Sequence, residues 1–241
     1  MNINIYVERL NNIFIKNNIS ICHGITHAKK VLENAINALD TSSYNINNIE
    51  KEYVLLASLL HDADDRKFFP SHLQNENLRN VLYDKSDEYV DFVIYLVNMV
   101  SCSKNGDTIL ESVIGKEWQL IPRYADRLEA IGIIGIERCF IYNKKINMKL
   151  FTENTPRPKT EEEIWKIASI ERYSKYNGKS DSMIDHYYDK LLRSTYFPIR
   201  NEYFDNECNI RRKQLIHFIL KFGEGNINND DDVLFYISTN Y

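Results

Sequence analysis

Apolar residues at helical spacing run from end to end of this 241-residue chain, and this pattern limits the fold more than any other feature. Eight glycines and five prolines are few for the length. A hydrophobic content of 44% is enough for one substantial core. We see no internal repeat and no linker that would divide the sequence. The pattern therefore predicts an all-α protein, and a single domain is favoured over two closely packed ones.

One predicted helix, residues 49–61, ends in a run of ligand-type side chains. It is apolar on most of its faces through residues 54–60, which is typical of a helix inside a core. His61 and Asp62 follow at its end, where an imidazole nitrogen and a carboxylate oxygen can reach one divalent ion. Asp64 and Asp65 would repel Asp62 unless a positive charge lay nearby. The alternative is a helix terminus followed by a solvated acidic loop.

Two histidines stand four residues apart at the start of the preceding predicted helix, residues 25–39. His23 and His27 share one helix face if that helix begins early enough. A single histidine on a packed helix is more often a satisfied core residue than a ligand. Two on one face, with a His-Asp pair on the next core helix, weaken that interpretation.

A second buried helix is predicted over residues 124–138, opened by Asp126 and Arg127. An unpaired carboxylate at the start of a buried helix is costly. Arg127 is one possible partner, but neighbouring helical residues point about 100° apart, so a partner from elsewhere is favoured, and a metal is one candidate. Gly132 and Gly135 leave one face bare, which predicts another helix crossing very closely.

Basic residues elsewhere in the chain are either ordinary surface charges or contacts for a phosphate. Arg66 and Lys67 follow the acidic turn, where they either balance its charge or meet a phosphate. Residues 143–160 carry several lysines and arginines without an apolar period, which predicts a mobile basic loop that is a solvated surface or a phosphate-covering lid. His186 and Lys190 share a face of a later helix.

Composition excludes several classes of protein. A formal net charge of −4 argues against a general nucleic-acid surface, though not against a small phosphorylated ligand in a local basic pocket. The cysteines are scattered without a C-x-x-C pair, so we expect reduced thiols in a cytosolic-type compartment. No stretch approaches membrane-spanning length, and no export signal opens the chain, so we expect a cytoplasmic protein without a membrane partner.

Two imidazoles and two carboxylates are expected from the ends of three helices: His27, His61, Asp62 and Asp126. This mixed set suits Mn²⁺, Mg²⁺ or Fe²⁺ better than a structural zinc, which favours thiolates. The order histidine, His-Asp, distant aspartate resembles the HD superfamily of metal-dependent phosphohydrolases. More narrowly, the sequence resembles the bacterial branch related to deoxynucleoside-triphosphate pyrophosphohydrolases. Four blocks match that branch in order: residues 23–31, 59–68, 124–138 and 186–192.

The chain departs from the pattern of that branch at several positions, among them the turn at residues 101–103, which lacks the histidine that often precedes it. Gly24, Lys30 and Tyr124 stand where the branch usually carries Asp, Arg and Asp. None of these changes removes an expected metal ligand, but they bear on substrate preference. The resemblance implies an HD-domain helical bundle with additional C-terminal helices. It divides the chain into an N-terminal helix (1–19), the HD core (20–142), the basic loop (143–160) and C-terminal helices that complete the same domain (161–241).

The resemblance also implies one divalent ion, Mn²⁺ or Mg²⁺ first and Fe²⁺, Co²⁺ or Ni²⁺ as further candidates. Asp65 is expected to be the general base, Lys67 to neutralise or protonate the leaving phosphate, and His23 to orient the site. Further residues are expected to bind substrate: Lys30, Arg127, His186 and Lys190.

The implied reaction is hydrolysis of a nucleoside triphosphate, in particular a deoxy one, to monophosphate and pyrophosphate. Alternatives on the same fold are a phosphodiesterase, a 5′-nucleotidase, or a nucleotide-binding regulator that turns over poorly. A purely structural helical protein would need the four ligand-type residues to coincide by accident. The expected partner is a small phosphorylated ligand, a nucleotide, bound by a monomer or homodimer.

Overall fold

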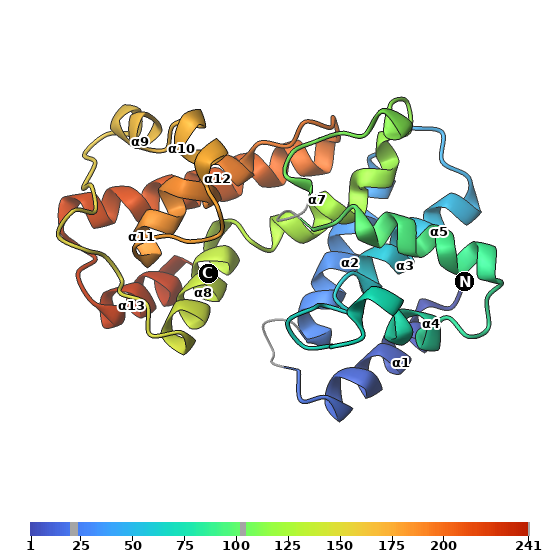
Figure 1. Ribbon diagram of the computed structural model, residues 1–241. Helices are drawn as coiled ribbons and strands as arrows, with labels where there is room; N and C mark the ends of the chain where they lie inside the picture. Colours follow the sequence, from blue (N-terminus) through green and yellow to red (C-terminus); the bar gives the residue numbers. More distant parts are fainter. Residues whose placement is uncertain (20–23, 102–104, 241) are drawn as a thin grey trace. The chain divides into compact units, whose positions relative to one another are not determined.

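The computed structural model describes residues 1–19, 24–101 and 105–240 (Figure 1). These residues form helices and turns and no strand, so the all-α prediction is confirmed. None of the described helices is long and apolar enough to cross a membrane. Contacts group the chain into two compact units, Met1–Asp126 with Pro198–Phe204, and Arg127–Phe197 with Asp205–Tyr241. The predicted boundaries at residues 20, 143 and 161 stay a prediction.

The first unit is built around α3 (Asn48–Leu60), which packs against α2 (Ile25–Asp40) and α5 (Asp87–Asn98). Further helices among its described residues are α1 (Ile3–Lys16), η2 (His72–Gln74), α4 (Glu76–Val81), η3 (Glu111–Val113), η4 (Glu117–Leu120) and α7 (Ile121–Leu128), which ends in the second unit.

Helix α3 is the predicted core helix. The Asn47 side chain accepts hydrogen bonds from the N–H groups of Ile49 and Glu50, and the Glu50 carboxylate accepts one from the Asn47 N–H. This capping box fixes where the helix begins. Val54 and every residue from Leu56 to Leu60 are buried, so the helix delivers His61 at the edge of the core.

The second unit contains α8 (Gly132–Lys145), α9 (Glu161–Ile167), α10 (Ile170–Lys175), α11 (Met183–His186), the π-helix η5 (Tyr187–Leu191), η6 (Arg193–Thr195), α12 (Glu202–Glu224) and α13 (Asp230–Asn240). Helix α12 begins with residues of the first unit and continues through the second.

The prediction of one continuous helix over residues 124–138 is wrong. Helix α7 ends at Leu128 and α8 begins at Gly132, so Asp126 lies in a last helical turn rather than a first one. The break lies between them, where Ile131 is extended (φ −129°, ψ 165°) and Gly132 follows with φ +73°, and neither conformation continues an α-helix.

The predicted close crossing is confirmed at Gly132 and wrong at Gly135. A Cβ atom on Gly132 would lie 2.6 Å from Gln214 Oε1 and 2.9 Å from Arg211 Cβ, both on α12. A Cβ atom on Gly135 would instead meet the backbone carbonyl of Ala130, in the turn that precedes its own helix.

The predicted basic loop begins later than expected, because residues 143–145 belong to α8, and two of its basic residues bind α12. Arg157 Nη1 donates to the Phe222 carbonyl oxygen at 2.8 Å, and Lys159 Nζ donates to that of Gly223. These carbonyls lie in the last turns of α12, where basic side chains stabilise a helix terminus.

Candidate metal centre

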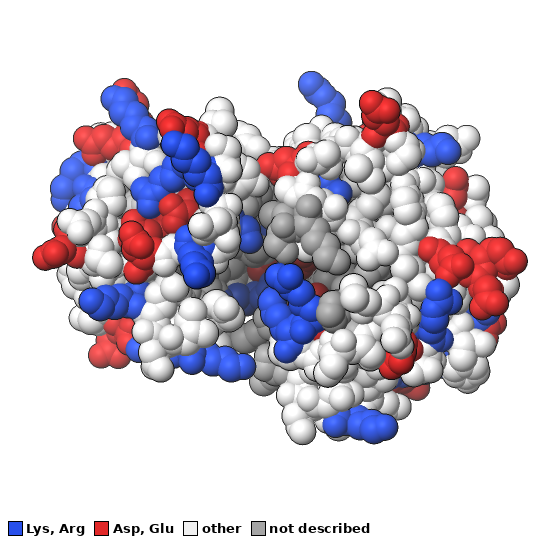
Figure 2. Space-filling model, viewed as in Figure 1, with Lys and Arg blue, Asp and Glu red and all other residues white. Residues whose placement is uncertain are grey.

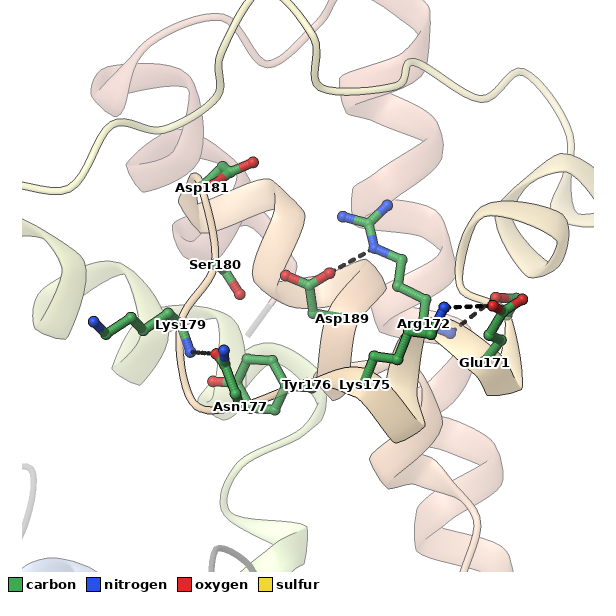
Figure 3. A pocket seen from close by; sticks show the side chains of 10 residues that line it. Glu171, Arg172, Lys175, Tyr176, Asn177, Lys179, Ser180, Asp181 and Asp189 are labelled. Carbon is green, nitrogen blue, oxygen red and sulfur yellow. Dashed lines mark hydrogen bonds and ion pairs between the residues drawn. The ribbon is translucent and has the colours of Figure 1, made fainter.

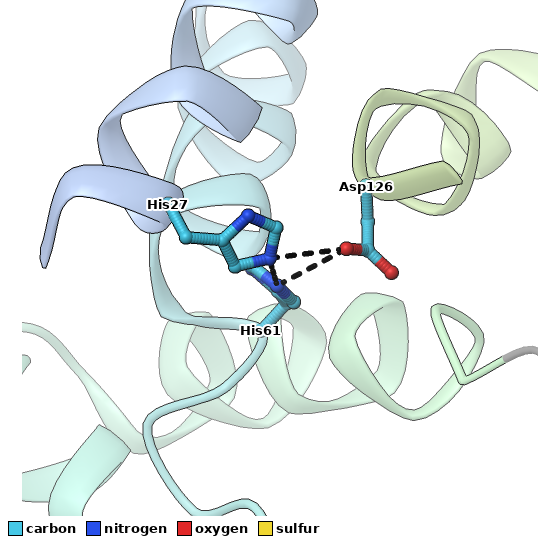
Figure 4. A group of neighbouring side chains, drawn as sticks. All are labelled: His27, His61 and Asp126. Atoms are coloured by element: carbon cyan, nitrogen blue, oxygen red, sulfur yellow. Dashed lines mark hydrogen bonds and ion pairs between the residues drawn. The ribbon is translucent and has the colours of Figure 1, made fainter. Parts of the chain in front are cut away.

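Three predicted ligands meet within the first unit: His27 of α2, His61 after α3 and Asp126 of α7 (Figure 4). His27 Nε2 lies 3.2 Å from both His61 Nε2 and Asp126 Oδ1. The third side of the triangle, His61 Nε2 to Asp126 Oδ1, measures 3.6 Å. Ligand atoms about 2.1 Å from one ion and at right angles to each other lie about 3.0 Å apart. The triangle is therefore close to the size that a divalent ion requires.

Asp62 contributes the fourth side chain. Its Oδ2 atom lies 3.5 Å from His61 Nε2 and 3.9 Å from His27 Nε2. His27, His61 and Asp126 thus form one compact group of ligand atoms, and Asp62 adds a second carboxylate beside the two histidines. This donor set fits Mn²⁺, Fe²⁺ or a similar divalent ion better than the thiolate sites of structural zinc.

A backbone carbonyl orients His61. Its Nδ1 lies 2.9 Å from the carbonyl oxygen of Ser58, one turn back on α3. Because a carbonyl can only accept, Nδ1 carries the proton, so in the neutral form of the ring the Nε2 lone pair faces the cluster. A histidine whose second nitrogen donates to a carbonyl is the usual arrangement at metal sites.

The charge of Asp126 is stabilised by its neighbours. Burial by itself raises the pKa of this carboxyl, but the hydrogen bond with His27 and the positive charges of His61 and His27 outweigh it and lower the pKa to about 2. The group is therefore an anion at neutral pH, as a metal ligand must be.

The acidic turn after His61 is held in two ways that relieve the predicted repulsion. The Asp64 carboxylate accepts hydrogen bonds from the N–H groups of Asn77 and Leu78, at 3.0 and 2.9 Å, and so caps the start of α4. Asp65 accepts a bond from the Lys67 N–H at 2.9 Å, and Lys67 Nζ lies 3.6 Å from its other oxygen. Burial, the larger effect, raises the pKa of Asp64. Nothing in the sequence indicated the Asp64 cap, because thirteen residues separate Asp64 from Asn77.

The remaining sequence positions of interest in this unit are Lys30, Tyr124 and His23. Lys30 is half exposed on α2 and pairs with Glu33 at 3.0 Å. Tyr124, at a position where the related branch has Asp, is fully buried, and its ring meets that of Phe204 edge-on. His23 lies outside the described residues.

Three predicted substrate-binding residues belong to the second unit. Arg127 is buried near the end of α7. His186 Nδ1 lies 3.2 Å from the Tyr176 hydroxyl and 3.3 Å from that of Ser180. Lys190 Nζ lies 5.9 Å from the centre of the Tyr176 ring. Burial and the charge of Lys190 lower the pKa of His186 to about 4, so its imidazole is neutral at pH 7.

An open pocket of about 500 Å³ is lined among others by Tyr176 and Ser180, the two residues whose hydroxyls contact His186 (Figure 3). Arg172 at its wall lies 2.5 Å from Asp189, and Lys175 lies 2.6 Å from Glu171. These two cations are therefore paired within the protein. Basic and acidic side chains are likewise interspersed over the face drawn in Figure 2.

The chain is similar in sequence to a protein of known sequence and in fold to several solved structures. No protein-family model matches the chain. The uncharacterized protein L803 of Acanthamoeba polyphaga mimivirus is 39% identical over 228 residues, covering 87% of this chain and 91% of L803.

Several solved structures have a similar fold. A protein of Lactobacillus plantarum superposes with a TM-score of 0.66 at 19% identity, covering 92% of this chain and 95% of its own. An HD-superfamily hydrolase of Bacillus thuringiensis gives 0.62 at 20% identity, with 94% and 97% coverage. Bacillus subtilis YpgQ in complex with ADP gives 0.59 at 18% identity, with 91% and 97% coverage. The HD-domain fold that the motifs implied is thereby confirmed.

Proposed function

The chain belongs to the family of the mimivirus protein L803 and has the HD-superfamily fold, and from these premises we propose that it is a divalent-metal-dependent phosphohydrolase. The observation that carries the proposal is the compact group of His27, His61 and Asp126, with the Asp62 carboxylate 3.5 Å from His61 Nε2 and 3.9 Å from His27 Nε2. A structural helical protein would have no reason to gather two imidazoles and two carboxylates from three helices at the edge of its core.

In the proposed site these four side chains hold the ion. When bound, the ion supplies Lewis acidity toward a phosphoryl oxygen and lowers the pKa of a water molecule. His61 keeps its Nε2 lone pair available because its Nδ1 proton is engaged by the Ser58 carbonyl. Asp126 contributes a carboxylate that stays ionised far below neutral pH. The identity of the ion, with Mn²⁺ or Mg²⁺ preferred, is part of the proposal.

We assign the proton transfer to Asp65. It lies in the same turn as Asp62, and its side chain is 14% exposed. Lys67 is bound to that turn through Asp65, which places a cation beside the acidic cluster, where a departing phosphate needs one. His23 is proposed to orient the site, and the proposed substrate-binding residues are those that the motifs indicated: Lys30, Arg127, His186 and Lys190.

The proposed substrate is a nucleoside triphosphate, in particular a deoxynucleotide, with monophosphate and pyrophosphate as products. Two observations support this choice. The four sequence blocks resemble the pyrophosphohydrolase branch, and the similar YpgQ structure was solved in complex with ADP. The net charge of −4 favours a small phosphorylated ligand over a nucleic acid.

Product analysis tests the proposal. The full chain is incubated with a panel of dNTPs and NTPs in the presence of Mn²⁺, Mg²⁺ or a chelator, and pyrophosphate and orthophosphate are measured separately. We expect metal-dependent pyrophosphate release that Asp62→Asn abolishes. Asp91→Asn is the matched control, because Asp91 is an exposed carboxylate that pairs with Arg79 outside the cluster. Activity that survives chelation, or that survives Asp62→Asn, would overturn the proposal.

A further inference from the structure

One buried amide joins the two helices that supply His27 and Asp126. Asn34 lies on α2 and is 4% exposed. It follows His27 by seven residues, so both side chains lie on the same face, two turns apart. Its Nδ2 atom donates to the Ala125 carbonyl oxygen at 3.1 Å, and its Oδ1 atom accepts from the Tyr203 hydroxyl at 2.8 Å. Ala125 immediately precedes Asp126 on α7.

The orientation of this amide follows from its partners. The Ala125 carbonyl can only accept a hydrogen bond, so the amide nitrogen must face it. The amide oxygen then faces Tyr203, whose hydroxyl donates. A flipped amide would set two oxygens against each other in a buried place, which costs free energy. The arrangement is therefore unique, and it holds α7 at a fixed distance from α2.

We infer that Asn34 is a positioning residue of the metal centre, which rests on the proposed function. His61 and Asp62 are adjacent in sequence, so α3 and the turn that follows it position both. His27 and Asp126 come from separate helices, and their 3.2 Å separation depends on how α2 and α7 are held. The Asn34 amide fixes the backbone one residue from Asp126. Ligand geometry must be correct to about 0.5 Å for a functional site, so loss of this link weakens metal binding.

The chain offers a matched control in Asn201. This asparagine is also buried, in the same unit, and its Nδ2 donates to the carbonyl oxygen of Ala38 on α2 at 2.8 Å. Its Oδ1 accepts bonds from the Thr41 hydroxyl at 3.3 Å and from the Phe204 N–H, in the first turn of α12, at 3.1 Å. Like Asn34, Asn201 is a buried amide that hydrogen-bonds a backbone carbonyl. The carbonyl that Asn201 binds, however, lies at the opposite end of α2 from His27. Loss of Asn201 should affect stability without affecting the metal.

The test compares Asn34→Leu with Asn201→Leu in the full chain. The Mn²⁺ dissociation constant is measured by titration, and thermal unfolding is followed in the absence of metal. Both variants should lose stability to a similar extent. Asn34→Leu should raise the Mn²⁺ dissociation constant about tenfold, the lower end of what loss of a supporting contact costs a metal site, and Asn201→Leu should leave it within about twofold. Tyr203→Phe, which removes only the hydroxyl, should give a smaller increase than Asn34→Leu and decides the matter if Asn34→Leu does not fold.

The outcomes are distinguishable. An unchanged dissociation constant in Asn34→Leu or, failing that variant, in Tyr203→Phe overturns the inference and leaves the proposed function standing. An equal loss of affinity in Asn201→Leu also overturns it, because the effect would then be one of general stability. Absence of Mn²⁺ binding in the unmodified protein overturns the metal site itself, and the inference with it.

Discussion

Gly132 lies where two helices of the second unit meet, and replacing it with alanine should destabilise the protein by about 4 kcal/mol. Three costs add up. An alanine in the left-handed conformation at φ +73° costs about 1 kcal/mol. Its Cβ atom would lie 2.6 Å from Gln214 Oε1, which accepts from the Ile133 N–H and so caps α8; losing a cap costs about 1 kcal/mol. The same atom would lie 2.9 Å from Arg211 Cβ and Cγ, and such overpacking costs about 2 kcal/mol.

Gly178→Ala is the matched control for this prediction. Gly178 also has positive φ, +94°, and belongs to the same unit, but a Cβ atom there would meet nothing within 4 Å. Its substitution should therefore cost only the conformational part, about 1 kcal/mol. Urea unfolding of the two variants, monitored by circular dichroism, measures the difference. If Gly132→Ala were no less stable than Gly178→Ala, the close approach of α8 and α12 would be refuted.

Two further predictions concern single side chains. Because burial and Lys190 lower the pKa of His186 to about 4, the unfolded state binds more protons than the folded state between about pH 6.5 and 4. Above about pH 6.5, where His186 is neutral in both states, its protonation does not lower the free energy of unfolding. As the pH drops toward 4, protonation of the unfolded state lowers that free energy by up to about 3 kcal/mol. His186→Gln should flatten that part of the profile of unfolding free energy against pH; an unaltered profile would contradict the assignment. Asp64→Ala should remove the α4 cap, costing about 1 kcal/mol, and weaken Mn²⁺ binding because the turn after Asp62 loosens. Ser86→Ala, which removes the cap of α5, should lower stability without altering Mn²⁺ affinity, and equal affinities in both variants would argue against the Asp64 role.

The sequence predicted those features that depend on local pattern. Helix α3 follows from its apolar run, and the meeting of His27, His61 and Asp126 follows from motif order. Each of these residues sits at or near a helix terminus, where a short sequence pattern is enough to place it.

The features that the sequence did not predict depend on contacts between distant segments. Asp64 caps a helix that begins twelve residues later, and Arg157 binds the end of α12, 65 residues away. Propensity does not indicate such partners, because any carboxylate or guanidinium has the same local preference. The break between α7 and α8 was missed for a related reason. The sequence predicts Gly132 inside a helix, as a position without a side chain on one face. In the structure Gly132 has left-handed φ and is the first residue of α8.

The central claim is that His27, His61 and Asp126 bind one divalent ion, and pulsed electron paramagnetic resonance of bound Mn²⁺ tests it most directly. The account predicts nitrogen couplings from two imidazoles, one of which disappears in His27→Ala. His217→Ala, which removes a histidine that contacts Tyr236 in the other unit, should leave both couplings in place. Bound Mn²⁺ without imidazole coupling, or couplings that His27→Ala leaves unchanged, would contradict the account.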